Sequence, residues 1–282
     1  MNITANLPST SWQGKVKLIY QHKQEKTTIK SSFAQAPFRL QSPFYPEGNS
    51  ICHSVILHTA GGVVGGDYLQ QEITLEPQAQ VFITTPAATK IYGSDQQTAF
   101  QDIEINLQKD SYLEYFPQET IFFNQAHFQQ KIRINLEENA LFLGWEIVRF
   151  GRTARKEIID QGQWLNYLEI WLGEKPLWIE RQKFRGDTGL FFSPNGLAGQ
   201  PVVANLIMMG KEVDSALIEE IRSLWTQEDI AGQWGVTALQ KGLLCRYQGF
   251  SVSESKKYLL KIWRLLRAKE GKSPLIKPRF WQ

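Results

Sequence analysis

Two pairs of glycines separated by two valines form the most conspicuous segment of this sequence that could do chemistry. Residues 60–67 read AGGVVGGD, and the interval from Gly61 to Gly66 is that of a phosphate-binding loop. Such a loop needs Lys and then Ser or Thr after its last glycine, so that an ammonium group reaches the phosphates. Asp67 and Tyr68 stand there instead, and a carboxylate repels phosphate. Nucleotide binding is therefore rejected for this segment.

The glycines then have two explanations. They permit positive φ and the close approach of two strands, so the first explanation is a tight structural turn capped by Asp67. The second is a flexible, carboxylate-bearing loop at a channel or at a partner surface. The positions concerned are Gly61, Gly62, Gly65 and Gly66.

Histidine, cysteine and carboxylate side chains could hold a metal such as nickel. The candidates are His22, His53, His58, His127, Cys52 and Cys245. Cys52 and His58 share a face of one predicted strand but stand about 20 Å apart along it, and His53 points the other way. One strand cannot chelate a metal with this set, so no tightly bound cofactor is expected. A transient site assembled from distant residues stays open.

Glu146 interrupts a segment, residues 141–150, that is apolar on both faces. A carboxylate in such a place is costly unless it is paired or hydrogen-bonded. Arg149 lies on the opposite face, so the partner of Glu146 must come from another strand. A buried ion pair and a polar internal passage are both compatible with this position.

Composition excludes several classes of protein. A hydrophobic fraction of 42% and a charged fraction of 21% are typical of a globular chain, and a net charge of +3 is too small to argue for nucleic acid. The basic run over residues 256–269 is expected to be the solvated face of a helix. The sequence has no signal-peptide pattern and no apolar run of about 20 residues, so we expect a cytoplasmic protein without a membrane partner. It also lacks the G-x-S-x-G and H-E-x-x-H motifs, and we expect no enzyme activity.

The elements that must position these residues are mostly strands. Apolar and polar residues alternate over residues 73–75, 103–107 and 130–136, which predicts half-buried strands. Residues 141–150 and, similarly, 164–172 are apolar on both faces, as is typical of strands between two layers. No sequence repeat of 20–50 residues is evident.

Two helices are predicted near the end of the chain, with a strand over residues 234–247 between them. Asp214 can cap the first helix, and Ser251 with Glu254 forms a possible capping box for the second. The apolar stripe of the second is Leu259, Ile262, Trp263 and Leu266. We therefore expect a mainly β, layered structure with two α-helices near the C-terminus, in a single domain over residues 1–282.

Five short blocks follow one another between about residues 52 and 281. They are GGVVGGD at 61–67, TTPAATKIY at 84–92, FPQETIFF at 116–123, WEIVRFGR at 145–152 and PRFW at 278–281. Together and in this order they resemble the UreD family of urease accessory proteins, called UreH in some genera. The positions that carry the likeness are Gly61, Gly62, Gly65, Gly66, Thr84, Thr85, Lys90, Tyr92, Gly151, Arg152, Pro278, Arg279 and Trp281.

Two positions depart from the pattern of the family. Lys156 stands before Glu157 where the family usually has glycine, and Phe280 stands before Trp281 where the family more often has isoleucine. These departures affect the local turn and the contacts of the tail.

The resemblance implies a non-catalytic scaffold for urease maturation with a helical, layered β-structure. It implies direct binding to UreF, binding to the GTPase UreG through UreF, and a complex that engages urease apoprotein to insert nickel. The absence of a phosphate loop here fits that division of labour, because the GTPase is another chain. The family is also thought to pass nickel through an internal tunnel, and Asp67, Glu119 and Glu146 are the candidate carboxylates near such a path. Nickel would be bound only transiently.

The remaining motif residues have two explanations each. Thr84, Thr85, Lys90 and Tyr92 could face a partner or form a β-turn stabilised by threonine hydroxyls. Arg152 could contact urease or form a structural ion pair. The exposed face of the last helix and the tail over residues 278–281 are candidate UreF contacts.

Two rival functions remain beside the scaffold. One is a β-rich enzyme with a dispersed active site. The other is a carbohydrate or small-ligand binder, which the 9 Trp and 9 Tyr residues would suit.

Overall fold

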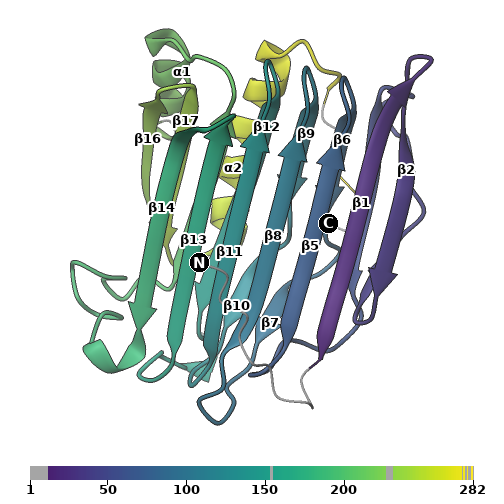
Figure 1. Ribbon diagram of the computed structural model, residues 1–282. Helices are drawn as coiled ribbons and strands as arrows, with labels where there is room; N and C mark the ends of the chain where they lie inside the picture. The colour runs from purple at the N-terminus through teal and green to yellow at the C-terminus, as the bar shows by residue number, and fades with distance from the viewer. Residues whose placement is uncertain are drawn as a thin grey trace.

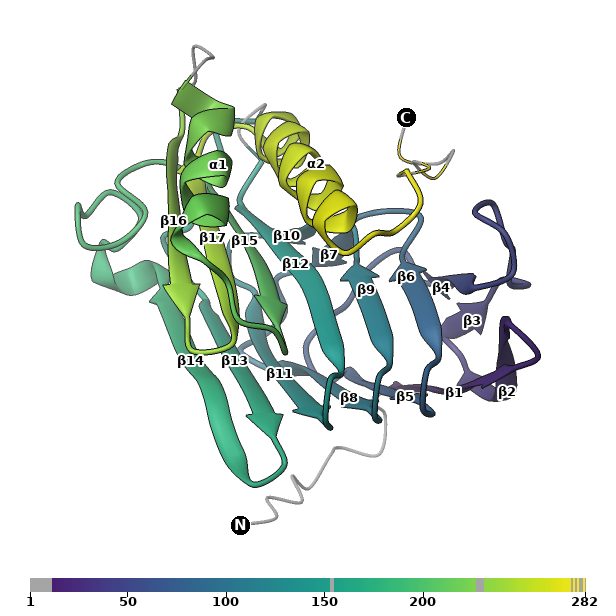
Figure 2. The same ribbon diagram turned by 90° about the horizontal axis from the view of Figure 1, so that it is seen from above.

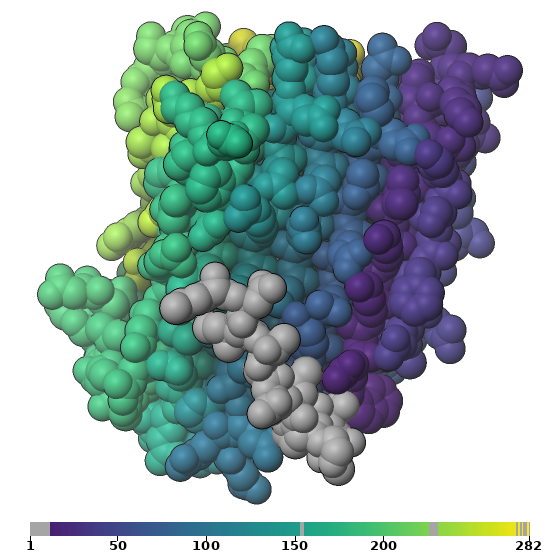
Figure 3. All heavy atoms as spheres, in the orientation of Figure 1, coloured from purple at the N-terminus to yellow at the C-terminus, as the bar shows by residue number. Residues whose placement is uncertain are grey.

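Two β-sheets lie face to face, and two helices cover the outer side of one of them (Figures 1 and 2). The computed structural model describes residues 12–152, 155–226, 231–274, 276, 278 and 281. The seven-stranded sheet contains β1 (Gln13–Lys23), β2 (Lys26–Gln35), β5 (Tyr68–Leu75), β8 (Ala99–Leu107), β11 (His127–Leu136), β13 (Gln163–Leu172) and β14 (Lys175–Arg185). Its outer face is the broad surface seen in Figure 3.

The ten-stranded sheet lies between the first sheet and the helices. It contains β3 (Phe38–Leu40), β4 (Ile51–His58), β6 (Gln80–Thr84), β7 (Thr89–Ile91), β9 (Tyr112–Phe116), β10 (Thr120–Phe122), β12 (Leu141–Phe150), β15 (Val202–Met209), β16 (Gln233–Leu239) and β17 (Gly242–Gly249). The helices are α1 (Ser215–Thr226) and α2 (Val252–Lys269), and a short 3₁₀ helix spans Gly186–Thr188. The prediction of a mainly β, layered structure with two helices is confirmed.

The central strands of both sheets form stacked coils. β5, β8, β11 and β13 run parallel, as do β4, β6, β9 and β12. Three consecutive coils pass from one sheet to the other through the same turn, in which Gln78, Asp110 and Asn139 have φ of 64°, 58° and 56°. The small residue that follows each of them donates its amide to a carbonyl three residues back at 3.1 Å. These turns are 32 and 29 residues apart, so the backbone repeats although no sequence repeat was evident.

The repeat is hard to detect in the sequence because the coils have the same backbone conformation at their turns but few identical residues at equivalent positions. Each turn needs one residue that tolerates positive φ and then a small residue, Ala or Ser. The strands need only to alternate apolar and polar residues, and many sequences do so.

Apolar side chains fill two layers, one between the sheets and one between the ten-stranded sheet and the helices. β12 contributes to both, which confirms the prediction that residues 141–150 lie between two layers. Phe142, Val148 and Phe150 pack in the layer between the sheets, and Leu141, Leu143, Trp145 and Ile147 pack in the layer under the helices.

Both predicted helices begin where the sequence indicated. Asp214 Oδ1 accepts a hydrogen bond from the Leu217 amide at 2.8 Å, and Ser251 Oγ accepts one from the Glu254 amide at 3.1 Å. The capping box does not close, because the Glu254 carboxylate accepts instead from the hydroxyl of the buried Tyr247 at 2.8 Å. None of the helices in the described part of the chain has the length and apolar character to cross a membrane.

The segment predicted as one strand over residues 234–247 is a hairpin of β16 and β17. A turn at Gln240 and Lys241 separates the two strands. These two polar residues precede Gly242, whose position has no room for a side chain, since a Cβ would lie 1.9 Å from the Met208 carbonyl oxygen. This short turn signal was missed.

Candidate functional site

A cavity of about 90 Å³ lies between the two sheets. Its wall extends across the strands, from His58 on β4 to Glu180 on β14. Polar side chains line it in the middle of an otherwise apolar layer, namely Gln71, Gln130, Glu146, Asn166 and Asn205. The amide oxygen of Asn205 is buried and has no hydrogen-bond partner among the described residues. Most of the wall is apolar, and the polar side chains gathered around Glu146 form the one part of it that the described residues equip to hold water.

Glu146 is the carboxylate of this polar strip. Its Oε1 accepts a hydrogen bond from Gln130 Nε2 at 2.5 Å, and its Oε2 accepts one from Asn166 Nδ2 at 2.7 Å. Both amides come from the facing sheet, which confirms that its partners lie on other strands. They are neutral groups, however, whereas an ion pair would require a cation. Enclosure between the sheets raises the pKa of Glu146 to about 7, an effect that the two amides offset only in part.

The ten-stranded sheet is interrupted next to the cavity. β6 ends at Thr84 and β7 begins at Thr89, while β9 ends at Phe116 and β10 begins at Thr120. We call the gap formed by residues 85–88 and 117–119 the sheet opening. Gln118 in this gap lines both the internal cavity and a second hollow on the helix side of the sheet. The cavity and the outer hollow therefore adjoin at the sheet opening.

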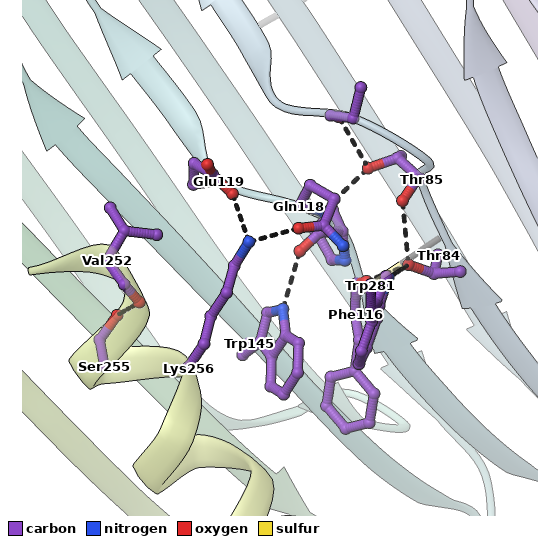
Figure 4. Close-up of polar contacts among 12 residues, drawn as sticks. Thr84, Thr85, Phe116, Gln118, Glu119, Trp145, Val252, Ser255, Lys256 and Trp281 are labelled. Carbon is purple, nitrogen blue, oxygen red and sulfur yellow. Dashed lines mark hydrogen bonds and ion pairs between the residues drawn. The ribbon is translucent and has the colours of Figure 1, made fainter. Parts of the chain in front are cut away.

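Two side chains from the C-terminal part of the chain cover the sheet opening (Figure 4). Lys256 of α2 points toward the gap, where its Nζ donates to Gln118 Oε1 and, at 2.6 Å, to Glu119 Oε2. The indole of Trp281 donates to Thr84 Oγ1 at 3.1 Å, and its ring lies 5.2 Å from that of Trp145.

Backbone and hydroxyl groups keep the edges of the gap in place. Thr84 Oγ1 donates to the Phe116 carbonyl at 2.6 Å, and Thr85 Oγ1 accepts from the Gln118 amide at 2.9 Å. The Trp145 indole donates to the Pro117 carbonyl at 2.7 Å. The threonine hydroxyls therefore stabilise the local backbone, as one of the two explanations for them predicted.

The glycine run forms a tight turn at another place on the molecule. Asp67 Oδ2 accepts from the Val64 amide at 2.9 Å, and Gly66 has φ of 90°. A Cβ on Gly62 would lie 2.3 Å from the ring of Tyr92, so this position requires close approach. The turn capped by Asp67 has a structural explanation, and Asp67 does not line the cavity.

An aromatic and cationic surface adjoins the glycine turn. The Tyr92 ring lies 4.9 Å from that of Phe123, and the Arg152 guanidinium lies 4.7 Å from the Phe123 ring centroid. Arg152 Nε also pairs with Glu157 Oε2 at 2.7 Å. Lys156, which stands at the position of the missing glycine, has φ of 53°. The turn thus keeps its shape with a residue that is strained there.

Comparison with known proteins identifies chains that are similar to this one over most of their length. The chain matches the family described as "UreD urease accessory protein" over residues 13–282. It belongs to the UreD family. Proteins named "Urease accessory protein UreD" are similar to it over most of both chains. The protein of Nostoc punctiforme is 48% identical over 271 residues, 96% of each chain. That of Thermosynechococcus vestitus is 45% identical over 271 residues, 96% of this chain and 98% of its own. That of Synechocystis is 39% identical over 250 residues, 88% of this chain and 93% of its own.

The family blocks of this UreD protein gather in two places. The glycine turn, Lys90, Tyr92, Gly151 and Arg152 lie around one surface, where the Val63 amide donates to the Lys90 carbonyl at 2.7 Å. Thr84, Thr85 and Trp281 lie at the sheet opening, and the nearby Pro278 is buried. Arg279 lies outside the described residues.

The three candidate carboxylates occupy three separate places in this UreD chain. Glu146 lines the cavity, Glu119 lies on the helix side of the sheet opening, and Asp67 caps the glycine turn. His58 lies at one edge of the cavity, while His53 pairs with Glu47 at 2.9 Å elsewhere. Within the described ranges no three His, Cys, Asp or Glu side chains are grouped so as to hold a metal ion.

Several site residues were missed in the sequence. Gln130 and Asn166 are amides at positions that share the inward parity of Ile132, Ile134 and Ile170, so a polar residue on an apolar face was the available signal. Lys256 was assigned to a solvated face. No local pattern could show that its ammonium group meets Gln118, because the two residues are 138 positions apart.

Proposed function

We propose that this chain is a urease maturation factor. It acts as a non-catalytic scaffold that binds UreF directly and the GTPase UreG through UreF, engages urease apoprotein in the cytoplasm, and supports nickel insertion. The observation that carries the proposal is the internal cavity with its strip of polar side chains and its enclosed carboxylate, found in a chain of the UreD family. Nickel is the cargo of this cavity and not a resident cofactor.

The chemistry of the cavity suits a divalent ion in transit. With a pKa of about 7, Glu146 can release a proton as a cation arrives and take one up as the cation leaves. The other polar groups around Glu146 are neutral amides, among them the Asn205 oxygen that has no partner among the described residues, while the His58 imidazole and the Glu180 carboxylate stand at the two ends of the wall. Nickel binds more tightly to imidazole and thiolate than to amide oxygens, so an ion beside Glu146 is held weakly enough to move on.

Two surfaces are proposed for the protein partners. The exposed face of α2, with the tail over residues 278–281, is the proposed UreF contact. The surface around the glycine turn is the proposed urease contact, since Val64 and Tyr92 are 46% and 36% exposed there. Exposed aromatic and apolar side chains beside an arginine are typical anchors of interfaces. No nucleic acid or membrane partner is proposed.

Urease activation in a heterologous host tests the proposal. Urease is expressed with all its accessory proteins, with and without this chain, and its activity and bound nickel are measured in limiting nickel. We expect inactive, nickel-poor urease when the chain is omitted. Fully active and nickel-loaded urease without it would overturn the proposal.

A matched pair of variants tests the role of the cavity in the same assay. Glu146→Gln removes the ionisable group from the cavity, whereas Glu104→Gln makes the same change on an exposed part of β8. We expect reduced nickel loading with the first and wild-type loading with the second, while both variants still assemble with their partners. Equal loading by the two variants would exclude Glu146 from the path.

A further inference from the structure

We infer that Lys256 is a tethered cation that closes the sheet opening to divalent ions until its side chain is drawn away. The inference rests on the proposed function and adds a regulatory element to it. The side chain moves, whereas the helix that carries it stays in place.

The ammonium group of Lys256 occupies the place that a cation crossing the sheet would need. Gln118 Oε1 and Glu119 Oε2 are side-chain oxygens at this gap, and Lys256 Nζ donates to both (Figure 4). A divalent ion and an ammonium group cannot share these two oxygens, because they repel each other at such short range. Bound Lys256 therefore competes directly with the cargo.

Aromatic side chains close the area beside Lys256. The Trp281 ring packs on Trp145 and, at 5.9 Å, on Phe82, and the indole nitrogen of Trp281 is engaged with Thr84. A hydrated ion gains nothing from such a wall. The polar route between the cavity and the outer hollow is consequently the one that Lys256 occupies.

The helix itself is held at both ends. At its start Glu254 accepts the hydroxyl hydrogen bond of Tyr247, and near its end Arg267 is 1% exposed and pairs with Glu47. Lys256, by contrast, retains 28% of its side-chain exposure and has four flexible carbons between backbone and charge. It can swing into solvent without displacing α2. A partner that presents carboxylates to this face of α2 would draw it away.

Nickel titration of the purified chain tests the inference. Lys256→Met keeps the apolar stem and removes the charge, and we expect it to bind Ni²⁺ roughly fivefold more tightly, as the loss of one competing ion pair implies. Arg264→Met, which removes the same charge from an exposed position of the same helix, should bind as wild type. Lys256→Arg should also bind as wild type, and Lys256→Met combined with Glu119→Gln should lose the gain.

The possible failures are distinguishable. If Lys256→Met titrates like Arg264→Met while both melt as the wild type does, the tethered-cation inference is wrong. The same conclusion follows if the gain survives Glu119→Gln. If instead urease is fully activated without this chain, the proposed function fails whatever Lys256 does. Omission that abolishes activation, together with an unchanged titration, overturns the inference alone.

Discussion

The two ends of α2 each pair a positive charge with a carboxylate from a loop of the ten-stranded sheet, and they do so in opposite ways. Near its start, Lys256 and Glu119 form a pair whose side chains are 28% and 19% exposed. Near its end, Arg267 and Glu47 are 1% and 0% exposed, and Arg267 donates to both carboxylate oxygens of Glu47. An enclosed pair fixes a helix because neither charge can return to water, whereas a half-exposed pair can exchange its partner for solvent.

The buried end is part of a wider network. Arg267 Nε lies 3.5 Å from Glu114 Oε1, which also accepts from the Trp263 indole at 2.6 Å and from the Tyr112 hydroxyl at 2.7 Å. Burial raises the pKa of Glu114 despite these donors. None of these four residues belongs to the blocks that identified the family. The anchor at Arg267 and the group proposed to move, Lys256, thus have different partners at opposite ends of the helix.

Removal of Arg267 should have the largest effect and tests the anchor directly. Arg267→Met leaves the carboxylates of Glu47 and Glu114 enclosed without their cation, so we expect a loss of about 3–5 kcal/mol in the free energy of unfolding. Denaturant unfolding measures it, with Arg264→Met on the exposed side of the helix as a control near zero. A loss below about 1 kcal/mol for Arg267→Met would remove the distinction between the two ends.

The carboxylate in the cavity should make stability depend on pH. The pKa of Glu146 rises from 4.5 in the unfolded chain to about 7 in the folded one, so between these values unfolding releases a proton. Rising pH therefore favours unfolding, and the folded state loses about 3 kcal/mol across this window. Unfolding free energies at pH 5 and 7.5 should show the decline in the wild type and its absence in Glu146→Gln. Parallel curves for the two proteins would contradict the assignment.

The half-exposed end of α2 should matter little for stability. We expect Lys256→Met to change the free energy of unfolding by less than about 1 kcal/mol, because solvent screens the pair with Glu119. The same denaturation series measures it. A loss comparable with that of Arg267→Met would show that Lys256 is a second anchor and not a movable group.

The smallest effect is expected at Lys156, which lies in the turn closed by a third ion pair, between Arg152 and Glu157. Lys156→Gly restores the glycine usual in the family at φ of 53°, which relieves backbone strain beside that pair. Because glycine also gains freedom in the unfolded chain, the net stabilisation should be only about 0.5 kcal/mol. An upward shift of the melting temperature by about 1 °C checks it, and a downward shift would show that Lys156 is not strained.

Local patterns predicted local features well. Ser251 marked the start of α2 because an N-cap depends on residues three positions apart, and the apolar residues of β12 marked its place between two layers. The partners of Glu146 could not be assigned, since they depend on which strands face one another. The basic run over residues 256–269 was expected to be solvated, and this was wrong for Arg267, whose partners are far away in the sequence.

The three similar turns at Gln78, Asp110 and Asn139 bear on the dimensions of the molecule. Each coil adds one strand to both sheets, and neighbouring strands are separated by about 4.8 Å. The number of coils therefore sets the width of both sheets, while the side chains within each coil set the polarity of the layer between them. Gain or loss of a whole coil would change the width of the molecule in fixed increments and leave its cross-section unaltered.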